Sequence, residues 1–288
     1  MPSLREVIQQ THQSLEASGI ADARLEAEVM VMNVMQMPRQ HIFAQQELEV
    51  SLQQQTALSQ VLDRRQKREP LAHILGYKEF YGINLLVNSD VLIPRPETET
   101  LVEHALFMSL MGMEVAQLAI ADVGTGTGAI AINLAIHLPA SRIYATDISE
   151  KSLAVANFNI RRHNVADRVT LCHGDLLDPL PEPVDLVVAN LPYIPSGRVS
   201  TLQPEIQWEP VVALDGGSQG LDLITRLISQ ARDKLNQQGV ILLEMDPEQF
   251  PAAEELARQY FPEAQTGVER DLAGLDRVFT ISRGEPEE

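Results

Sequence analysis

Apolar and polar residues alternate with a helical period over the N-terminal quarter of the chain. Ser3 and Glu6 have the spacing of a helix capping box. The apolar positions that follow recur every three or four residues, at Leu4, Val7, Ile8 and Leu15. A second apolar face begins after Asp22 and stops at Pro38. No strand pattern interrupts these runs, so the sequence predicts an all-helical domain over residues 1–74.

Residues 75–92 have a different pattern, in which aromatic and β-branched residues alternate with turn formers. The segment Phe80-Tyr81-Gly82-Ile83 is typical of a tight turn between two short strands. We therefore expect a β-hairpin here that links the helical domain to the rest of the chain.

Strand-like apolar runs and amphipathic segments alternate over residues 93–288. Strands are predicted at Leu118–Val123, Arg142–Thr146, Val169–His173, Val184–Ala189 and Gly239–Glu244, and helices near Ala129–Leu138, Glu150–His163 and Leu221–Leu235. This alternation predicts an α/β domain with a parallel sheet covered on both faces. The last two predicted strands, 264–269 and 277–282, have a connection too short for a crossover, which favours an antiparallel hairpin.

Composition and charge count against several classes of protein. The 288 residues, 44% of them hydrophobic, suit a soluble protein with one large and one small domain. A net charge of −18 is opposite to that of a protein that binds through phosphates, so no direct nucleic-acid binding is expected. No stretch is apolar enough for a signal peptide or a membrane span, so we expect a cytoplasmic location and no membrane partner. No Cys or His cluster has metal-ligand spacing, so no metal is expected.

A run of cations, Arg64-Arg65-Gln66-Lys67-Arg68, precedes Pro70. Cations suit the negative end of a helix dipole, so one interpretation is a solvated helix end. The other interpretation is a docking surface for an acidic partner. The sequence leaves both open.

A glycine-rich segment lies between a predicted strand and a predicted helix. Its candidate cofactor-binding residues are Gly124, Thr125, Gly126, Thr127 and Gly128. Asp147 ends the next predicted strand, where its carboxylate can accept both hydroxyls of a ribose. Gly124, Gly126 and Ala129 also satisfy the dinucleotide pattern, so an NAD enzyme remains an alternative at this point.

Two residues after the third predicted strand are candidates for recognising a purine. Asp175 can accept a hydrogen bond from an adenine amino group, and the apolar Leu176 beside it can flank the ring. The alternative for Asp175 is a helix N-cap.

The segment Asn190-Leu191-Pro192-Tyr193 follows an apolar predicted strand, at the sheet edge where open α/β sheets bind ligands. An amide or aromatic amine nitrogen is a poor nucleophile, because its lone pair is delocalised. Two acceptors aimed at its N–H bonds favour a pyramidal nitrogen and stabilise the charge that develops there. The Asn190 side-chain oxygen and the Leu191 carbonyl can be these acceptors, and Tyr193 can stack on a planar group. The segment therefore favours nitrogen methylation over hydride transfer.

At these residues the chain resembles the N5-glutamine methyltransferases that modify the Gly-Gly-Gln loop of class 1 peptide-chain release factors. The resemblance covers nearly the whole chain. Its motifs are Pro70 to Gly76, Leu92-Ile93-Pro94-Arg95-Pro96-Glu97-Thr98-Glu99, the glycine loop, Asp147, Asn190 to Tyr193, Glu209-Pro210 and Asp271 to Gly274.

The resemblance implies a seven-stranded, Rossmann-like S-adenosylmethionine-dependent methyltransferase domain with a reversed last strand, and a small helical domain that grips the protein substrate. It implies S-adenosyl-L-methionine as cofactor and a release factor as partner. Asn190, Leu191, Pro192 and Tyr193 are then the catalytic and substrate-binding residues, and Asn190 also contacts the cofactor. Two kinds of enzyme with the same arrangement of active-site residues remain alternatives. One methylates a glutamine of a ribosomal protein, and the other methylates adenine N6 in nucleic acid.

Arg95 has two interpretations. Two prolines and Glu97 are typical of a rigid turn before a helix, and the resemblance implies that the block closes over the substrate. The chain also departs from the family pattern twice. Leu191 replaces the usual proline but keeps the carbonyl, and Met245-Asp246-Pro247-Glu248-Gln249 replaces a glycine- and glutamine-rich turn.

Overall fold

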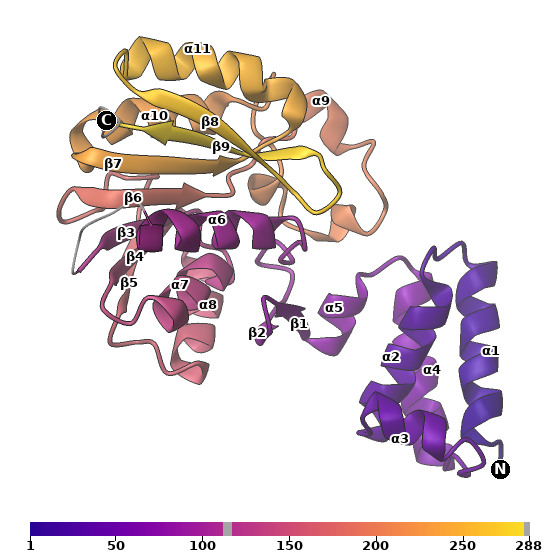
Figure 1. Ribbon diagram of the computed structural model, residues 1–288. Helices are drawn as coiled ribbons and strands as arrows, with labels where there is room; N and C mark the ends of the chain where they lie inside the picture. Colours follow the sequence, from indigo (N-terminus) through magenta and orange to yellow (C-terminus); the bar gives the residue numbers. More distant parts are fainter. Residues whose placement is uncertain (112–116, 285–288) are drawn as a thin grey trace. The chain divides into compact units, whose positions relative to one another are not determined.

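The computed structural model describes residues 1–111 and 117–284, and the chain forms two compact units (Figure 1). Residues Met1–Gly76 together with Gln203–Trp208 form the helical unit. Residues Tyr77–Leu202 and the chain from Glu209 onward form the sheet unit. The sequence pattern predicts residues 203–208 within the α/β domain, whereas the structure packs them with the N-terminal helices.

Five helices make up most of the helical unit. They are α1 (Leu4–Ala17), α2 (Ala23–Met35), α3 (Arg39–Ala44), α4 (Leu52–Gln66) and α5 (Leu71–Leu75). The predicted capping box is present, since the Ser3 side chain accepts from the Glu6 N–H and Glu6 accepts from the Ser3 N–H. The fully buried side chains of this unit include Leu4, Leu15, Met30 and Ile42. Ile42 lies on α3, a helix that the sequence analysis did not predict.

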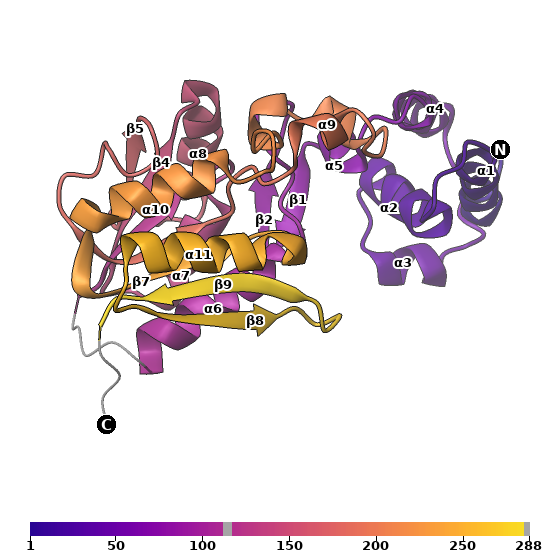
Figure 2. The same cartoon turned by 90° about the horizontal axis from the view of Figure 1, so that it is seen from above.

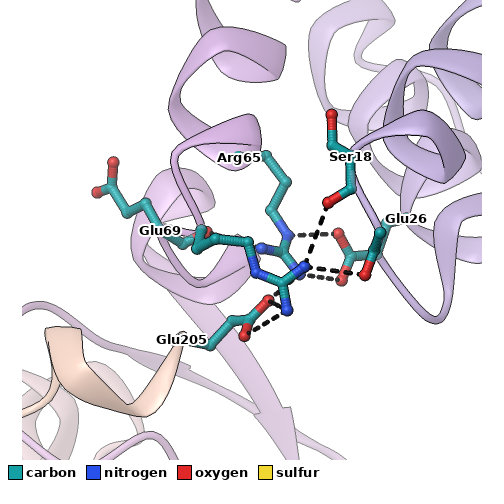
Figure 3. Close-up of polar contacts among 7 residues, drawn as sticks. Ser18, Glu26, Arg65, Glu69 and Glu205 are labelled. Carbon is teal, nitrogen blue, oxygen red and sulfur yellow. Dashed lines mark hydrogen bonds and ion pairs between the residues drawn. The ribbon is translucent and has the colours of Figure 1, made fainter. Parts of the chain in front are cut away.

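The arginines of the cationic run, at the end of α4 and just after it, form ion pairs inside the helical unit (Figure 3). The side chain of Arg65 is only 5% exposed, and its Nε lies 2.6 Å from Glu26 while an NH2 nitrogen lies 2.9 Å from Glu205. Arg68 reaches the same oxygen of Glu205 at 2.9 Å, and Arg64 pairs with Glu69 at 2.5 Å. For Arg65, therefore, neither a solvated helix end nor an open docking surface is correct, because the guanidinium is enclosed between two carboxylates.

The sheet unit begins with the hairpin of β1 (Tyr77–Phe80) and β2 (Ile83–Leu86), which pair antiparallel. Asn159, fully buried, fastens this hairpin to the glycine loop. Its side chain exchanges two hydrogen bonds with the backbone of Leu86, at 2.8 and 3.1 Å, and donates to the Thr127 carbonyl at 2.9 Å.

A seven-stranded sheet forms the centre of this unit, in the order β5-β4-β3-β6-β7-β9-β8. Its strands are β3 (Ala119–Val123), β4 (Arg142–Asp147), β5 (Val169–His173), β6 (Val184–Ala189), β7 (Leu235–Glu244), β8 (Gln265–Arg270) and β9 (Asp276–Ser282). The first five pair in parallel, whereas β9 pairs antiparallel with both β7 and β8. The predicted α/β fold with a reversed last strand is confirmed.

Helices cover both faces of the sheet (Figures 1 and 2). One face packs against α6 (Thr98–Met111), α7 (Ala129–His137) and α8 (Glu150–Arg162), and the other against α10 (Asp222–Lys234) and α11 (Phe250–Tyr260). The short helices are α9 (Ser196–Val199), η1 (Ile206–Trp208), η2 (Val211–Ala213) and η3 (Pro247–Gln249). Every residue of β3 is buried, which explains its unbroken apolar run. Within the described ranges, no helix has both the length and the apolarity that a bilayer crossing requires.

Candidate active site

The glycine loop turns sharply at the carboxyl end of β3. Gly124 and Gly128 have φ values of +73° and +81°, in the left-handed region that favours glycine. A Cβ on Gly128 would also lie 3.2 Å from Ile132 Cδ1, so a side chain at this position would crowd α7. The N–H groups of Gly124 and Thr125 both donate to the Thr146 carbonyl at 2.9 Å, which holds the loop against the end of β4.

Asp147 lies beside this loop, at the end of β4. Its Oδ2 accepts from the Gly126 N–H at 3.0 Å and its Oδ1 from the Ser149 N–H at 2.9 Å. Burial raises the pKa of the Asp147 carboxyl above its usual value, and the two backbone N–H groups partly offset that rise. Each oxygen retains acceptor capacity, so the carboxylate can bind hydroxyl groups of a ligand.

Asp122 lies behind the loop and is completely buried. Its Oδ2 accepts from the Thr125 hydroxyl at 2.6 Å and from the Ala131 N–H at 3.0 Å, whereas its Oδ1 has no partner among the described residues. Burial raises the pKa of Asp122 to about 6. The Thr125 side chain therefore points into the protein, and Thr127, 3% exposed, is also buried. If these two threonines contact a cofactor, they do so through their backbone.

A cavity of about 270 Å³ opens beside the loop, within the sheet unit. It brings together eight of the residues predicted from sequence: Gly124, Gly126, Asp147, Asp175, Leu176, Asn190, Leu191 and Pro192. Thr125, Thr127, Gly128, Tyr193 and Arg95 are not among the residues that line it. Ile148, which is 57% exposed, does line it, although the sequence pattern does not predict this residue as part of the site. The available signal was an apolar residue directly after the strand-ending Asp147.

Asp175 is held by two side chains of α10. Its Oδ2 accepts from the Arg226 guanidinium and, at 3.3 Å, from the Gln230 amide. The next residue, Leu176, is 7% exposed and has a φ of +50°, an uncommon conformation for a branched side chain. No helix begins here: the Asp178 N–H donates to the Asp175 carbonyl at 3.0 Å, which closes a turn. The helix N-cap interpretation of Asp175 is therefore wrong.

Asn190 follows the last residue of β6, the strand between β3 and β7. Its Nδ2 donates to the hydroxyl of Thr98, the first residue of α6, at 2.9 Å. None of the described groups donates to its Oδ1, which remains available as an acceptor. Leu191 is 4% exposed and is one of the residues that line the cavity.

The turn that departs from the family pattern supports the Asn-Leu-Pro-Tyr segment. Gln249, 7% exposed, donates through its Nε2 to the Tyr193 carbonyl at 2.8 Å and to the Gln219 carbonyl at 3.0 Å. Its Oε1 accepts from the Asp246 N–H at 3.2 Å, as part of a capping box. The side chain of Gln249 thus fixes the backbone of Tyr193 without the usual glycines.

Arg95 pairs with Glu209, whose side chain is 1% exposed. The second oxygen of Glu209 accepts from the Ile93 N–H at 2.9 Å. Glu209 therefore ties the chain before α6 to the segment that leads into η2. This contact agrees with the rigid-turn interpretation of Arg95. The sequence alone could not pair two residues so far apart in the chain.

The cavity suits a nucleoside better than a metal ion. Among the residues that the structure describes, no cluster of His, Cys, Asp and Glu is arranged to hold a metal. The cavity instead offers the Asp147 carboxylate, the apolar side chains of Ile148 and Leu176, and the bare backbone of Gly124 and Gly126. A carboxylate suits ribose hydroxyls, apolar walls suit a purine ring, and exposed glycine backbone suits a closely approaching ligand.

The mixed seven-stranded sheet, with an Asn-Leu-Pro-Tyr turn beside a glycine loop, is that of a methyltransferase. Residues 115–207 match a family described as methyltransferase domain, and residues 6–76 match the PrmC N-terminal domain. The chain belongs to the release factor glutamine methyltransferase family. A protein of that name from Moorella thermoacetica is 39% identical over 98% of this chain and 99% of its own length. Another from Coxiella burnetii is 38% identical, over 99% of this chain and 100% of its own.

Solved structures share the fold at much lower identity. A methyltransferase from Pyrococcus furiosus aligns with a TM-score of 0.53 at 17% identity, over 72% of this chain and 92% of that one. The hMettl16 catalytic domain, in complex with MAT2A 3′UTR hairpin 6, aligns with a TM-score of 0.58 at 18% identity, over 78% and 84%. At such identities the likeness shows the fold alone.

Proposed function

We propose that this protein transfers a methyl group from S-adenosylmethionine to the side-chain amide nitrogen, N5, of the glutamine in the Gly-Gly-Gln motif of class 1 release factors. The observation that carries the proposal is the full-length similarity to proteins named release factor glutamine methyltransferase. That similarity includes the N-terminal helices as well as the sheet unit. The chemistry of the cavity is compatible with it.

The cofactor assignment rests on the contents of the cavity. Asp147 would accept the ribose hydroxyls, Ile148 and Leu176 would flank the purine, and Gly124 and Gly126 would let the ligand approach the backbone. Asp175 faces the same cavity, but its Oδ2 already accepts from Arg226. A contact from Asp175 to the adenine amino group would therefore use the remaining oxygen. When bound, S-adenosylmethionine would supply the electrophilic methyl group.

The residues of the Asn-Leu-Pro-Tyr turn activate the acceptor nitrogen. The Asn190 Oδ1 and the Leu191 carbonyl accept hydrogen bonds from the two N–H groups of the glutamine amide. These two hydrogen bonds favour a pyramidal nitrogen whose lone pair faces the methyl group. Both acceptors stabilise the positive charge that develops on the nitrogen, and one N–H proton is then lost to water to give the neutral N-methyl amide. No strong base is therefore required. Pro192 restricts Leu191 to an extended conformation, and Tyr193 stacks on the planar amide. Arg95 is held by Glu209, and its proposed role in closing the substrate side rests on the family resemblance.

The protein substrate is tested by offering several acceptors together. Purified class 1 release factor, ribosomal proteins, RNA and DNA are mixed with the enzyme and labelled S-adenosylmethionine, and each fraction is counted. We expect label in the release factor, on the peptide that contains Gly-Gly-Gln. Label in a ribosomal protein or in adenine bases, with none in the release factor, would replace this proposal by one of those two activities.

We also propose that the helical unit docks the folded release factor. A glutamine loop flanked by glycines is flexible, so an isolated peptide bears a large ordering cost when it binds. A folded partner can offset that cost through additional contacts, and we expect intact release factor to be methylated much faster than a Gly-Gly-Gln peptide. Arg65 is not a candidate contact, because it is enclosed by Glu26 and Glu205, whereas the neighbouring Lys67 is exposed. Equal efficiencies on peptide and protein would remove the docking role.

A further inference from the structure

Thr98 connects the Asn190 side chain to a buried carboxyl group at the end of the neighbouring strand. The Thr98 hydroxyl accepts from the Asn190 Nδ2 at 2.9 Å and also hydrogen-bonds the carboxyl of Glu244. Glu244 is the last residue of β7, and the preceding residue, Leu243, is paired with Ala189 of β6. The parallel register therefore places Glu244 level with Asn190. All of these residues belong to the sheet unit.

The three groups are shielded from water to different extents. Thr98 is 5% exposed and Glu244 is 2% exposed, whereas Asn190 lines the cavity. The Oε2 atom of Glu244 has no hydrogen-bond partner among the described residues. A carboxyl group that is buried and only partly hydrogen-bonded is costly in stability, so its place beside the acceptor site calls for a functional explanation.

The direction of the hydrogen bonds follows from the number of protons. A threonine hydroxyl has one proton, and an ionised carboxylate can only accept. The Thr98 proton therefore goes to Glu244, and the hydroxyl can only accept from Asn190. The amide edge that faces Thr98 must then be the NH2 group. The Asn190 Oδ1 is left on the opposite edge, as an acceptor for a substrate N–H.

We propose that Glu244 and Thr98 are positioning residues, which together hold the Asn190 amide with its oxygen facing the glutamine nitrogen. This inference rests on the proposed function. Without an ionised carboxylate at Glu244, the Thr98 hydroxyl can donate to the Asn190 Oδ1 instead. The amide then turns over and presents its NH2 group to a substrate that itself offers N–H bonds. The Asn190 NH2 group and the substrate N–H groups are then both hydrogen-bond donors, so they form no hydrogen bond and the charge on the glutamine nitrogen is not stabilised.

The protonation of Glu244 connects this arrangement to pH. Burial raises the pKa of Glu244 to about 7, while the Thr98 hydrogen bond, the positive charge of Arg277 and the Tyr193 hydroxyl lower it and the charge of Glu97 raises it. The carboxyl group therefore gains its proton as the pH falls through neutrality. A protonated Glu244 donates to Thr98, whose own proton then turns to Asn190. We expect kcat to fall below about pH 7 in the wild-type protein.

Three substitutions test the arrangement. Thr98→Val removes the hydroxyl and keeps the shape of the side chain, Glu244→Gln removes the carboxylate, and Thr98→Ser keeps a hydroxyl. We expect the first two to lower kcat on release factor at least about tenfold, and Thr98→Ser to stay within about threefold of wild type. Thr100→Val, two residues further along the same helix, is the matched control, and its kcat should be unchanged. KM for S-adenosylmethionine and the melting temperature confirm that each variant folds and binds.

Two further readouts separate positioning from a merely structural role. The fall in kcat below about pH 7 should disappear in Thr98→Val, and Thr98→Val should add no further loss to Asn190→Ala, since it acts only through Asn190. A Thr98→Val protein with wild-type kcat, or one that keeps the pH dependence, would overturn the inference. Wild-type methylation of release factor is measured in the same series. If it is absent, the proposed function fails. If it is present and Thr98→Val matches it, only the positioning role fails.

Discussion

The side chain of Leu191 lies directly over the bare Cα of Gly124: a Cβ placed on Gly124 would meet Leu191 Cδ2 at 3.1 Å. Gly124 follows β3 and Leu191 follows β6, and these strands are neighbours in the sheet. The contact joins the loop proposed to bind the cofactor to the turn proposed to bind the substrate amide. The residue that makes this contact, Leu191, is also the one that departs from the family pattern, where proline is usual.

Leu191→Pro should stay active within about tenfold of wild type, or about 1.4 kcal/mol of barrier. The proposed mechanism uses the carbonyl of residue 191, which proline retains. Among the described residues, no loop or turn hydrogen bond uses the Leu191 N–H, so proline removes none. Steady-state kcat on release factor is the measurement. A folded but inactive variant would give the leucine side chain a role beyond packing on Gly124.

Asp147→Ala should weaken S-adenosylmethionine binding by about 1–3 kcal/mol, because charge-assisted hydrogen bonds to the ribose are lost. The variant also loses the bond to the Gly126 N–H, so part of the effect comes from the loop itself. Asp147→Asn keeps one acceptor oxygen, so its affinity for S-adenosylmethionine should lie between that of wild type and that of Asp147→Ala. Isothermal calorimetry with S-adenosylmethionine and with NAD measures both ligands. Tight binding of NAD, with none of S-adenosylmethionine, contradicts the cofactor assignment.

Glu205→Gln should destabilise the protein by about 1–3 kcal/mol, because it leaves the enclosed Arg65 with one carboxylate fewer. Burial by itself would raise the pKa of Glu205, but its own backbone N–H and the cations Arg65 and Arg68 outweigh burial and lower it. A lowered carboxyl pKa contributes stability above pH 4.5, and this contribution is lost as the pH falls through the folded-state pKa. The difference in free energy of unfolding between wild type and Glu205→Gln, measured in urea, should therefore decrease at acidic pH. The exposed Glu16→Gln is the control.

Glu244→Gln should have opposite effects on activity and stability at high pH. Burial raises the pKa of Glu244 from 4.5 to about 7, so the folded state binds this proton more tightly than the unfolded state. The resulting stability is fully present below pH 4.5 and is lost as the pH rises through about 7. Relative to wild type, the free energy of unfolding of Glu244→Gln should therefore increase by about 3 kcal/mol as the pH rises from 4.5 to about 7. Urea unfolding across pH, with the exposed Glu248→Gln as control, measures the difference; a pH-independent difference would place the carboxyl in a wetter environment.

Local pattern was sufficient to predict most elements and the residues around the cavity. Unbroken apolar runs marked the buried parallel strands, and polar residues at their carboxyl ends marked Asp147 and Asn190. The sequence did not predict contacts that depend on strand order or on helix packing. Thr98 had the pattern of a helix start and Glu244 that of a strand end, and only the pairing of β6 with β7 and the packing of α6 bring both to Asn190. Arg65 had the pattern of a surface cation because Glu205 is distant in the sequence.

The most direct test of the account is to locate the transferred methyl group and to show its dependence on Asn190. Release factor is incubated with S-adenosylmethionine and either wild-type protein or Asn190→Ala, and tandem mass spectrometry locates the modification. We expect wild type to place one methyl group on the side-chain amide of the Gly-Gly-Gln glutamine. The Asn190→Ala variant should be strongly impaired while it still binds the cofactor. A methyl group on another residue, or wild-type rates from Asn190→Ala, would contradict the proposed mechanism.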